Sequence, residues 1–257
     1  MSAVPLSILD RANTRVQHGQ VVGAPQIFAE VTSRAQHAEQ LGYHRFWVAQ
    51  HHSVPGIAGS APTLLLPHLA EATSHIRLGT GGIMVPSHQP LIVAEQLGTL
   101  QALYPNRLDA GLGASVGFTK PVRAALRQAA NAKDHFAEDV DEIIAYLNAT
   151  GEITAYPQDR SQTPIFILTG GGSAQFAATR GAGLVLGGPA VSRGIKTSQD
   201  ANQTAVDYRE AFAESTSRGQ QPHVIASINV AVADSYEAAE QLVLSEAWAL
   251  TRSRSIG

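Results

Sequence analysis

The stretch Ile76-Arg-Leu-Gly-Thr-Gly-Gly-Ile-Met84, followed by a segment that opens at Pro90, contains the unit from which the fold is built. The first part is a short apolar run that ends in glycines, which is typical of a strand followed by a turn. In the second part Val93, Leu97 and Leu100 recur at spacings of three and four residues, as they do on one face of a helix. A strand, a glycine-rich turn and a helix therefore follow one another directly.

The same alternation runs along most of the chain. The predicted strands are Pro5–Asp10, Phe46–His51, Ile76–Met84, Arg107–Gly113, Pro164–Thr169, Leu184–Gly187 and Val224–Ala233. Helical stripes fill the gaps, and the cleanest apolar face runs from Phe136 to Leu147. Because nearly every strand is followed by a helix, sequential strands should be parallel with right-handed crossovers. This pattern leaves two architectures, a closed (β/α) barrel or an open doubly wound sheet.

Polar or glycine-rich signals at several strand ends favour the barrel. They occur at Gln50-His51-His52, Gly79–Gly82, Gly111–Gly113 and Gly170–Gly172. A barrel explains this spread because all its strand C-termini open onto one face. A barrel of this type has eight strands, whereas the sequence predicts seven, followed by a final helix from about Tyr236. We therefore expect a (β/α) TIM-type barrel that is short of one terminal βα unit.

The absence of any linker or repeat predicts a single domain over residues 1–257. An irregular insertion is expected at about 115–163, a stretch that carries glycine and proline at several places. One core of this size suits the composition, since 44% of the 257 residues are hydrophobic and 15% are charged.

Charge and composition also exclude several classes of function. The chain has 18 Lys and Arg against 21 Asp and Glu, so neither nucleic acid nor an anionic membrane is an expected partner. The lack of cysteine excludes disulfides, thiolate nucleophiles and cysteine-ligated metals. No signal peptide or run of ~18 apolar residues is found, so we expect a cytoplasmic protein.

None of the glycine clusters has the G-x-G-x-x-G spacing that is typical of dinucleotide-binding folds. Gly79-Thr80-Gly81 would need glycine at Met84, and Gly111-Leu112-Gly113 would need it at Val116, so a nicotinamide-binding domain is disfavoured. Gly170-Gly171-Gly172-Ser173 lies between a predicted strand and a predicted helix, where free backbone N–H groups and a hydroxyl can bind an anion. An ordinary βα turn is the alternative, but three successive glycines favour phosphate binding.

His51 and His52 end the second predicted strand. Adjacent strand residues point to opposite faces, which disfavours a mononuclear metal site and turns one imidazole toward the barrel mouth. Histidine there can move a proton near neutral pH, although a packed, hydrogen-bonded histidine is the alternative. His88 and His135 are interpreted as structural or solvated, and Asp109 as a paired core carboxylate. No metal site is predicted.

Four segments in order resemble the bacterial luciferase-like flavin monooxygenase family. They are Leu41–His52, Ile76–Pro86, Pro90–Gln96 and Asn106–Gly113, with a looser match over Pro164–Gly188. The resemblance implies a (β/α) barrel that uses reduced FMN and O2 to oxygenate a small apolar organic substrate through a peroxyflavin.

The resemblance also implies roles for individual residues. His51 matches the family's active-site histidine, and His52 is its matching neighbour; both are predicted as catalytic. Gly81-Gly82 matches a non-proline cis peptide beside the flavin ring, and residues 170–173 match the flavin-phosphate loop. The predicted cofactor contacts are Thr80, Gly81, Gly82, Gly113, Ala114, Gly170, Gly171, Gly172 and Ser173.

Two positions depart from the family pattern. Gln50 replaces the usual glutamate before the two histidines, which weakens the argument for a tuned histidine pKa. Ala114 replaces an arginine that often follows Gly-x-Gly, so Arg123 or Lys120 is a candidate substitute on the phosphate.

The chain has no nicotinamide fingerprint, so a separate flavin reductase is the expected partner that supplies reduced FMN. The resemblance further implies a homodimer, formed through helices that include Leu64–Leu69. Two alternative functions stay open, a non-catalytic flavin-binding protein and a deazaflavin-dependent oxidoreductase.

Overall fold

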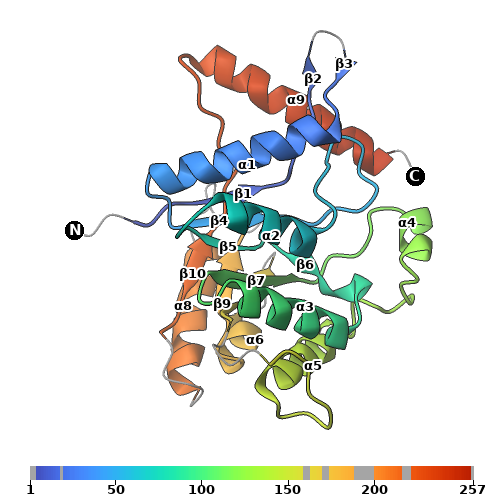
Figure 1. Cartoon of the computed structure of the whole chain (residues 1–257), viewed down its shortest axis with the longest axis vertical. Coiled ribbons are helices and arrows are strands. Elements are labelled where there is room, and N and C mark those ends of the chain that lie inside the picture. Colours follow the sequence, from blue (N-terminus) through green and yellow to red (C-terminus); the bar gives the residue numbers. More distant parts are fainter. Residues whose placement is uncertain are drawn as a thin grey trace.

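A curved parallel sheet with helices packed along it forms the body of the protein (Figure 1). The computed structural model describes residues 4–17, 20–158, 163–169, 174–187, 200–215 and 221–255. The strands of the sheet are β1 (Ser7–Asp10), β4 (Arg45–Val48), β5 (Arg77–Thr80), β6 (Ile83–Met84), β7 (Leu108–Gly113), β8 (Ile165–Thr169), β9 (Gly183–Leu186) and β10 (Val224–Ala226).

Helices follow most of these strands. They are α1 (Ala24–Gln40), α2 (Pro62–Ala72), α3 (Pro90–Leu103), α4 (Lys120–Ala125), α5 (Phe136–Asn148), α6 (Ala174–Thr179), α8 (Asp200–Glu214) and α9 (Tyr236–Ser255), with a 3-10 turn η1 (Val85–Ser87). A separate antiparallel hairpin joins β2 (Val16–Gln17) to β3 (Gln20–Val21). None of the helices within the described ranges is long and apolar enough to cross a membrane.

The topology confirms the predicted (β/α) barrel class. The strand order is β1-β4-β5-β7-β8-β9-β10, with β6 also paired to β7, and every pairing in the sheet is parallel. Within the described residues nothing pairs β1 with β10, so the sheet is a curled part of a barrel. This open form agrees with the expectation of a barrel lacking one βα unit.

Several predicted strand ends are wrong. β4 ends at Val48 instead of His51, because the chain turns away and the His51 backbone N–H donates to the Gly59 carbonyl at 2.9 Å. β10 ends at Ala226 instead of Ala233, and the side chains of Ile228 and Val230 beyond it are exposed. An alternating pattern alone does not keep a strand going where no second neighbouring strand is present.

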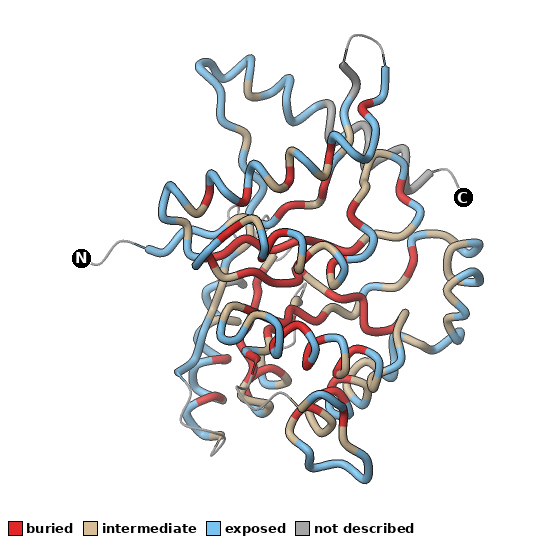
Figure 2. The backbone as a smooth tube through the Cα atoms, in the orientation of Figure 1, coloured by how far each residue is buried: buried red, intermediate tan, exposed pale blue. Residues whose placement is uncertain are grey.

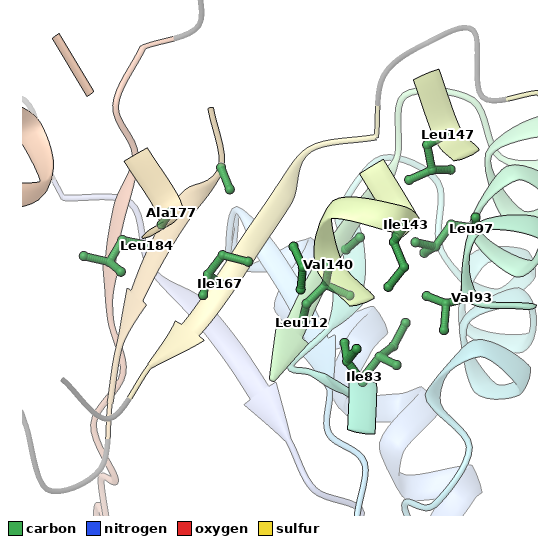
Figure 3. Close-up of a cluster of buried hydrophobic side chains, with 14 of the residues drawn as sticks. Ile83, Val93, Leu97, Leu112, Val140, Ile143, Leu147, Ile167, Ala177 and Leu184 are labelled. Carbon is green, nitrogen blue, oxygen red and sulfur yellow. The ribbon is translucent and has the colours of Figure 1, made fainter. Parts of the chain in front are cut away.

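Two large apolar clusters hold the helices against the sheet. One lies between β7, α3 and α5, where Leu112, Leu97 and Ile143 are buried against one another (Figure 3). The other lies under α1 and α2. Figure 2 shows that the buried residues follow the strands and the inner faces of the helices, whereas the described part of α9 is mostly exposed. Each fully buried leucine or isoleucine contributes about 1.5–3 kcal/mol.

A buried ionic cluster lies at the N-terminal ends of the strands. Oδ2 of Asp109 accepts hydrogen bonds from Arg45 Nε at 2.9 Å and from Trp47 Nε1 at 3.2 Å. Oδ1 accepts from Arg77 Nη2 at 2.6 Å and from Arg77 Nε at 3.1 Å. Asp109 is therefore the paired core carboxylate that the sequence predicts.

Candidate active site

The C-terminal ends of the central strands meet at one edge of the sheet. In the register of neighbouring strands, Gly113 of β7 lies beside Met84 of β6 and beside Leu168 of β8. The loop after β4 joins this edge because Oε1 of Gln50 accepts a hydrogen bond from the Met84 backbone N–H at 2.8 Å. Segments far apart in the sequence therefore build one site, at the end of the sheet opposite the Asp109 cluster.

Gln50 is the centre of the polar contacts at this edge. Its side chain is buried, and its Nε2 lies 2.6 Å from Nε2 of His52 and 2.9 Å from Nε2 of His88. His88, interpreted from the sequence as structural or solvated, lies directly after η1 and contacts the Gln50 side chain. His52 and His88 are thus held on one amide, although 36 positions separate them in the sequence.

His51 has a different environment. Its Nδ1 atom is buried and has no hydrogen-bond partner among the residues that the structure describes. Its ring packs against Phe118, with 6.1 Å between the ring centroids. Burial lowers the pKa of His51 to about 4, and the positive charge of Arg11 and the neighbouring His52 add to this shift. At neutral pH the imidazole is uncharged, so one of its nitrogens can accept a hydrogen bond.

Burial also lowers the pKa values of His52 and His88, the latter with a further contribution from His52. His51 and His52 lie in the loop after β4 and not in the strand, so the expectation that they point to opposite faces of a strand does not apply. In the described part of the chain no group of three His, Asp or Glu side chains is arranged to hold a metal ion.

Of the predicted cofactor residues, Thr80 ends β5, and Gly81 and Gly82 lie between β5 and β6. The Gly81-Gly82 peptide bond is cis, as the resemblance implies. The Thr80 hydroxyl donates to the Gly111 carbonyl at 2.8 Å and accepts from the Gly111 N–H at 2.9 Å, so this side chain joins β5 to β7. A Cβ atom on Gly82 would lie 2.8 Å from the Gly111 carbonyl oxygen, which explains why a side chain is excluded there.

Gly113 and Ala114 lie at the end of β7, where both are partly exposed. A Cβ atom on Gly113 would meet nothing closer than the Ile83 carbonyl oxygen at 3.7 Å, so the space beside this glycine is open. Arg123, one candidate substitute for a phosphate-binding arginine, donates through Nη1 to the Gly117 carbonyl at 2.8 Å. It holds the loop that carries Phe118.

The predicted phosphate cradle, Gly170, Gly171, Gly172 and Ser173, lies outside the described residues. The elements on either side of it are those that the sequence predicts, since β8 ends at Thr169 and α6 begins at Ala174. Its role as an anion site stays a prediction.

Sequence reasoning missed His88, Phe118 and Arg11 as members of the site. His88 carried a usable signal, because it follows a predicted strand end by only four residues. Phe118 and Arg11 carried no such signal in the sequence. Only in the folded chain does Phe118 pack against the His51 ring and does the charge of Arg11 act on it.

The sequence matches one family model and several known proteins. The family model described as luciferase-like monooxygenase matches residues 8–255. The chain is 35% identical over 244 residues to the protein YvbT of Bacillus subtilis (strain 168), an alignment that covers 93% of this chain and 70% of YvbT. It is 35% identical over 235 residues to a luciferase-like monooxygenase of Escherichia coli (strain K12), with 90% of this chain and 68% of that protein covered.

Solved structures show the same fold. The crystal structure of apo-MsnO8 superposes with a TM-score of 0.77 at 30% identity, covering 93% of this chain and 70% of that one. The monooxygenase RslO1 from Streptomyces bottropensis superposes with a TM-score of 0.80 at 22% identity, covering 98% of this chain and 80% of that one. The family model and the two relatives at 35% identity cover most of the chain. This chain belongs to the luciferase-like monooxygenase family.

Proposed function

We propose that the protein uses reduced FMN and O2 to oxygenate a small apolar organic substrate. Family membership supports an oxidoreductase of the monooxygenase type. The observation that carries the finer proposal is His51, a neutral imidazole whose buried Nδ1 lacks a partner in the described residues. Such an atom is costly to bury unless a ligand completes its hydrogen bonding.

The residues at the sheet edge suit a flavin. Gly81-Gly82 and Gly113-Ala114 present backbone with little or no side chain, so a planar ring can approach closely. Residues 170–173 would hold the phosphate. When bound, the reduced flavin supplies two electrons, so that one oxygen atom of O2 enters the substrate and the other leaves as water.

The chain's own residues then have distinct tasks. His51 would accept a hydrogen bond at Nδ1 beside the reacting atoms, because it is uncharged at neutral pH and this atom has no partner among the described residues. Phe118, which is 39% exposed, would contact a ligand bound beside the His51 ring, and Met84 is buried at the end of β6.

A separate flavin reductase, a cytoplasmic location and a homodimer belong to the same proposal. Leu64 supports the dimer, because its side chain is exposed on α2 whereas Leu66 and Leu69 of the same helix pack into the core. The reductase follows from the absence of a dinucleotide fingerprint in the sequence.

Stopped-flow absorbance tests the proposal. The protein is mixed with reduced FMN, then with oxygenated buffer, and the return of the oxidised flavin spectrum is followed. We expect a slower return than for free flavin, and product formation from an apolar substrate panel. His51→Ala should reduce oxygenation more than flavin binding, whereas His37→Ala, on the exposed side of α1, should change neither.

Two outcomes would indicate a different function. Tight binding of oxidised FMN without product, unaffected by His51→Ala, would indicate a non-catalytic flavin-binding protein. Binding of a deazaflavin in preference to FMN would indicate a hydride-transfer enzyme. Gly171→Asp provides an independent test of the phosphate loop, because a negative charge there should weaken binding of the flavin phosphate itself.

A further inference from the structure

The Gln50 side-chain amide makes three hydrogen bonds, one with the Met84 backbone N–H and two with histidine rings. We propose that Gln50 is a positioning residue that holds His52 and His88 as neutral imidazoles, each protonated on Nδ1. The proposal goes beyond the proposed function, since it concerns the protein without cofactor or substrate.

The first step is the orientation of the amide. Oε1 of Gln50 lies 2.8 Å from the backbone nitrogen of Met84, and a backbone N–H can only donate. The reverse orientation would bring two donors together at this buried contact. The amide oxygen therefore faces Met84, and the amide nitrogen faces the histidines.

The second step is the hydrogen count. Nε2 of Gln50 carries two hydrogens and accepts none, and it lies 2.6 Å from Nε2 of His52 and 2.9 Å from Nε2 of His88. Each of these ring nitrogens must therefore be an acceptor. A neutral imidazole with an accepting Nε2 has its proton on Nδ1. Protonation of either ring at Nε2 would place a donor against a donor.

The surroundings of His52 and His88 also favour the uncharged form of each ring. His52 and His88 are both partly buried, and burial disfavours a charged imidazole. The charged and titratable groups that act on the three rings are Arg11, which is positive, and the histidines themselves. The site therefore contains three uncharged imidazoles, of which His52 and His88 each offer an Nδ1–H donor and His51 offers an unpartnered Nδ1.

The wild-type protein can be tested directly, without flavin. Long-range proton–nitrogen NMR spectra of the protein labelled with 15N-histidine distinguish the two neutral tautomers and the charged form. His52→Gln and His88→Gln identify the two signals. At pH 7 we expect protonated Nδ1 and unprotonated Nε2 in both rings. A charged ring, or a proton on Nε2 in either ring, would overturn the proposal.

Gln50→Glu tests whether the Gln50 amide determines the protonation of the two rings. The carboxylate keeps an oxygen for the Met84 N–H and has the same shape, but it replaces the two donated hydrogens with an acceptor. We expect a proton on Nε2 of at least one ring, and a rise of about 1 to 3 units in that ring's pKa. Gln40→Glu, at the exposed C-terminal end of α1, is the control for an added negative charge and should change neither signal.

Gln50→Glu also distinguishes a positioning role of Gln50 from simple packing. If Gln50→Glu leaves the tautomers and the titration of both rings as in the wild type, Gln50 does not determine their protonation. If the variant does not fold, the wild-type spectrum alone decides, because the three hydrogen bonds permit only one tautomer at each ring.

Discussion

Removal of the Asp109 carboxylate should destabilise the fold more than any exposed ionic substitution. The Asp109 side chain is fully buried, and it accepts four hydrogen bonds from Arg45, Trp47 and Arg77. In Asp109→Ala, Arg77 keeps its bonds to the Asn106 and Leu108 carbonyl groups. Arg45, whose side chain is only 8% exposed, loses its ion-pair partner.

The magnitude follows from that uncompensated charge. Removing one partner of a buried pair costs about 3–5 kcal/mol of the free energy of unfolding. For a chain of this length, such a loss lowers the midpoint of thermal unfolding by about 6 to 20 °C. Urea unfolding and thermal unfolding, both followed by circular dichroism, measure these two quantities.

Two further variants test whether the buried charge causes this loss of stability. Asp141→Ala removes a carboxylate that is 54% exposed and paired with Arg180, so it should cost less than about 1 kcal/mol. The double variant Asp109→Ala with Arg45→Met should recover part of the loss, because it removes both buried charges. If Asp109→Ala costs no more than Asp141→Ala, or if the double variant is the least stable of all, the reasoning fails.

Three other predictions concern packing and pH. Gly111→Ala should cost more than about 1 kcal/mol, because its Cβ would lie 2.1 Å from the Thr80 carbonyl oxygen, whereas Gly113→Ala should be tolerated; urea midpoints compare the two. Tyr208→Phe should cost about 1–3 kcal/mol by the same assay, because its buried hydroxyl joins the Ala182 carbonyl to a backbone N–H at 2.8 and 3.1 Å. The free energy of unfolding should decrease as pH falls from 6.5 toward 4, since the unfolded chain takes up a proton at His51 near pH 6.5 but the folded chain, with a pKa of about 4, does not. The slope from this residue is about 1 kcal/mol per pH unit, and His51→Gln should make the measured slope shallower.

Local periodicity was sufficient to predict alternating strands and helices, and the polar and glycine-rich strand ends favoured a barrel over an open sheet. The apolar stripes predict α3 and α5 closely, and the alternation of strands with helices predicts the parallel sheet. Strand ends were less predictable, because hydrogen bonds to distant segments decide them. β4 stops at Val48, and His51 beyond it donates its backbone N–H to the Gly59 carbonyl at 2.9 Å, a contact that no local pattern contains.

The same limit applies to the site. His51 and His52 were predictable from their place after a strand, but their different environments were not. The contact between Gln50 and His88 joins residues 38 positions apart, and the contact between Gln50 and Met84 joins residues 34 apart. Both depend on how the loop after β4 folds over β6, which is a property of the tertiary structure.

Among the described residues β10 lies at an edge of the sheet, and this has a practical consequence for work with this chain. β10 pairs only with β9 in the described residues, and the chain beyond it carries exposed Ile228, Val230 and Val232 at alternate positions. Exposed backbone donors and acceptors next to alternating apolar side chains form a template to which a strand from another molecule can add. Aggregation through this edge should increase with protein concentration, and charged substitutions at Val230 or Val232 should oppose it.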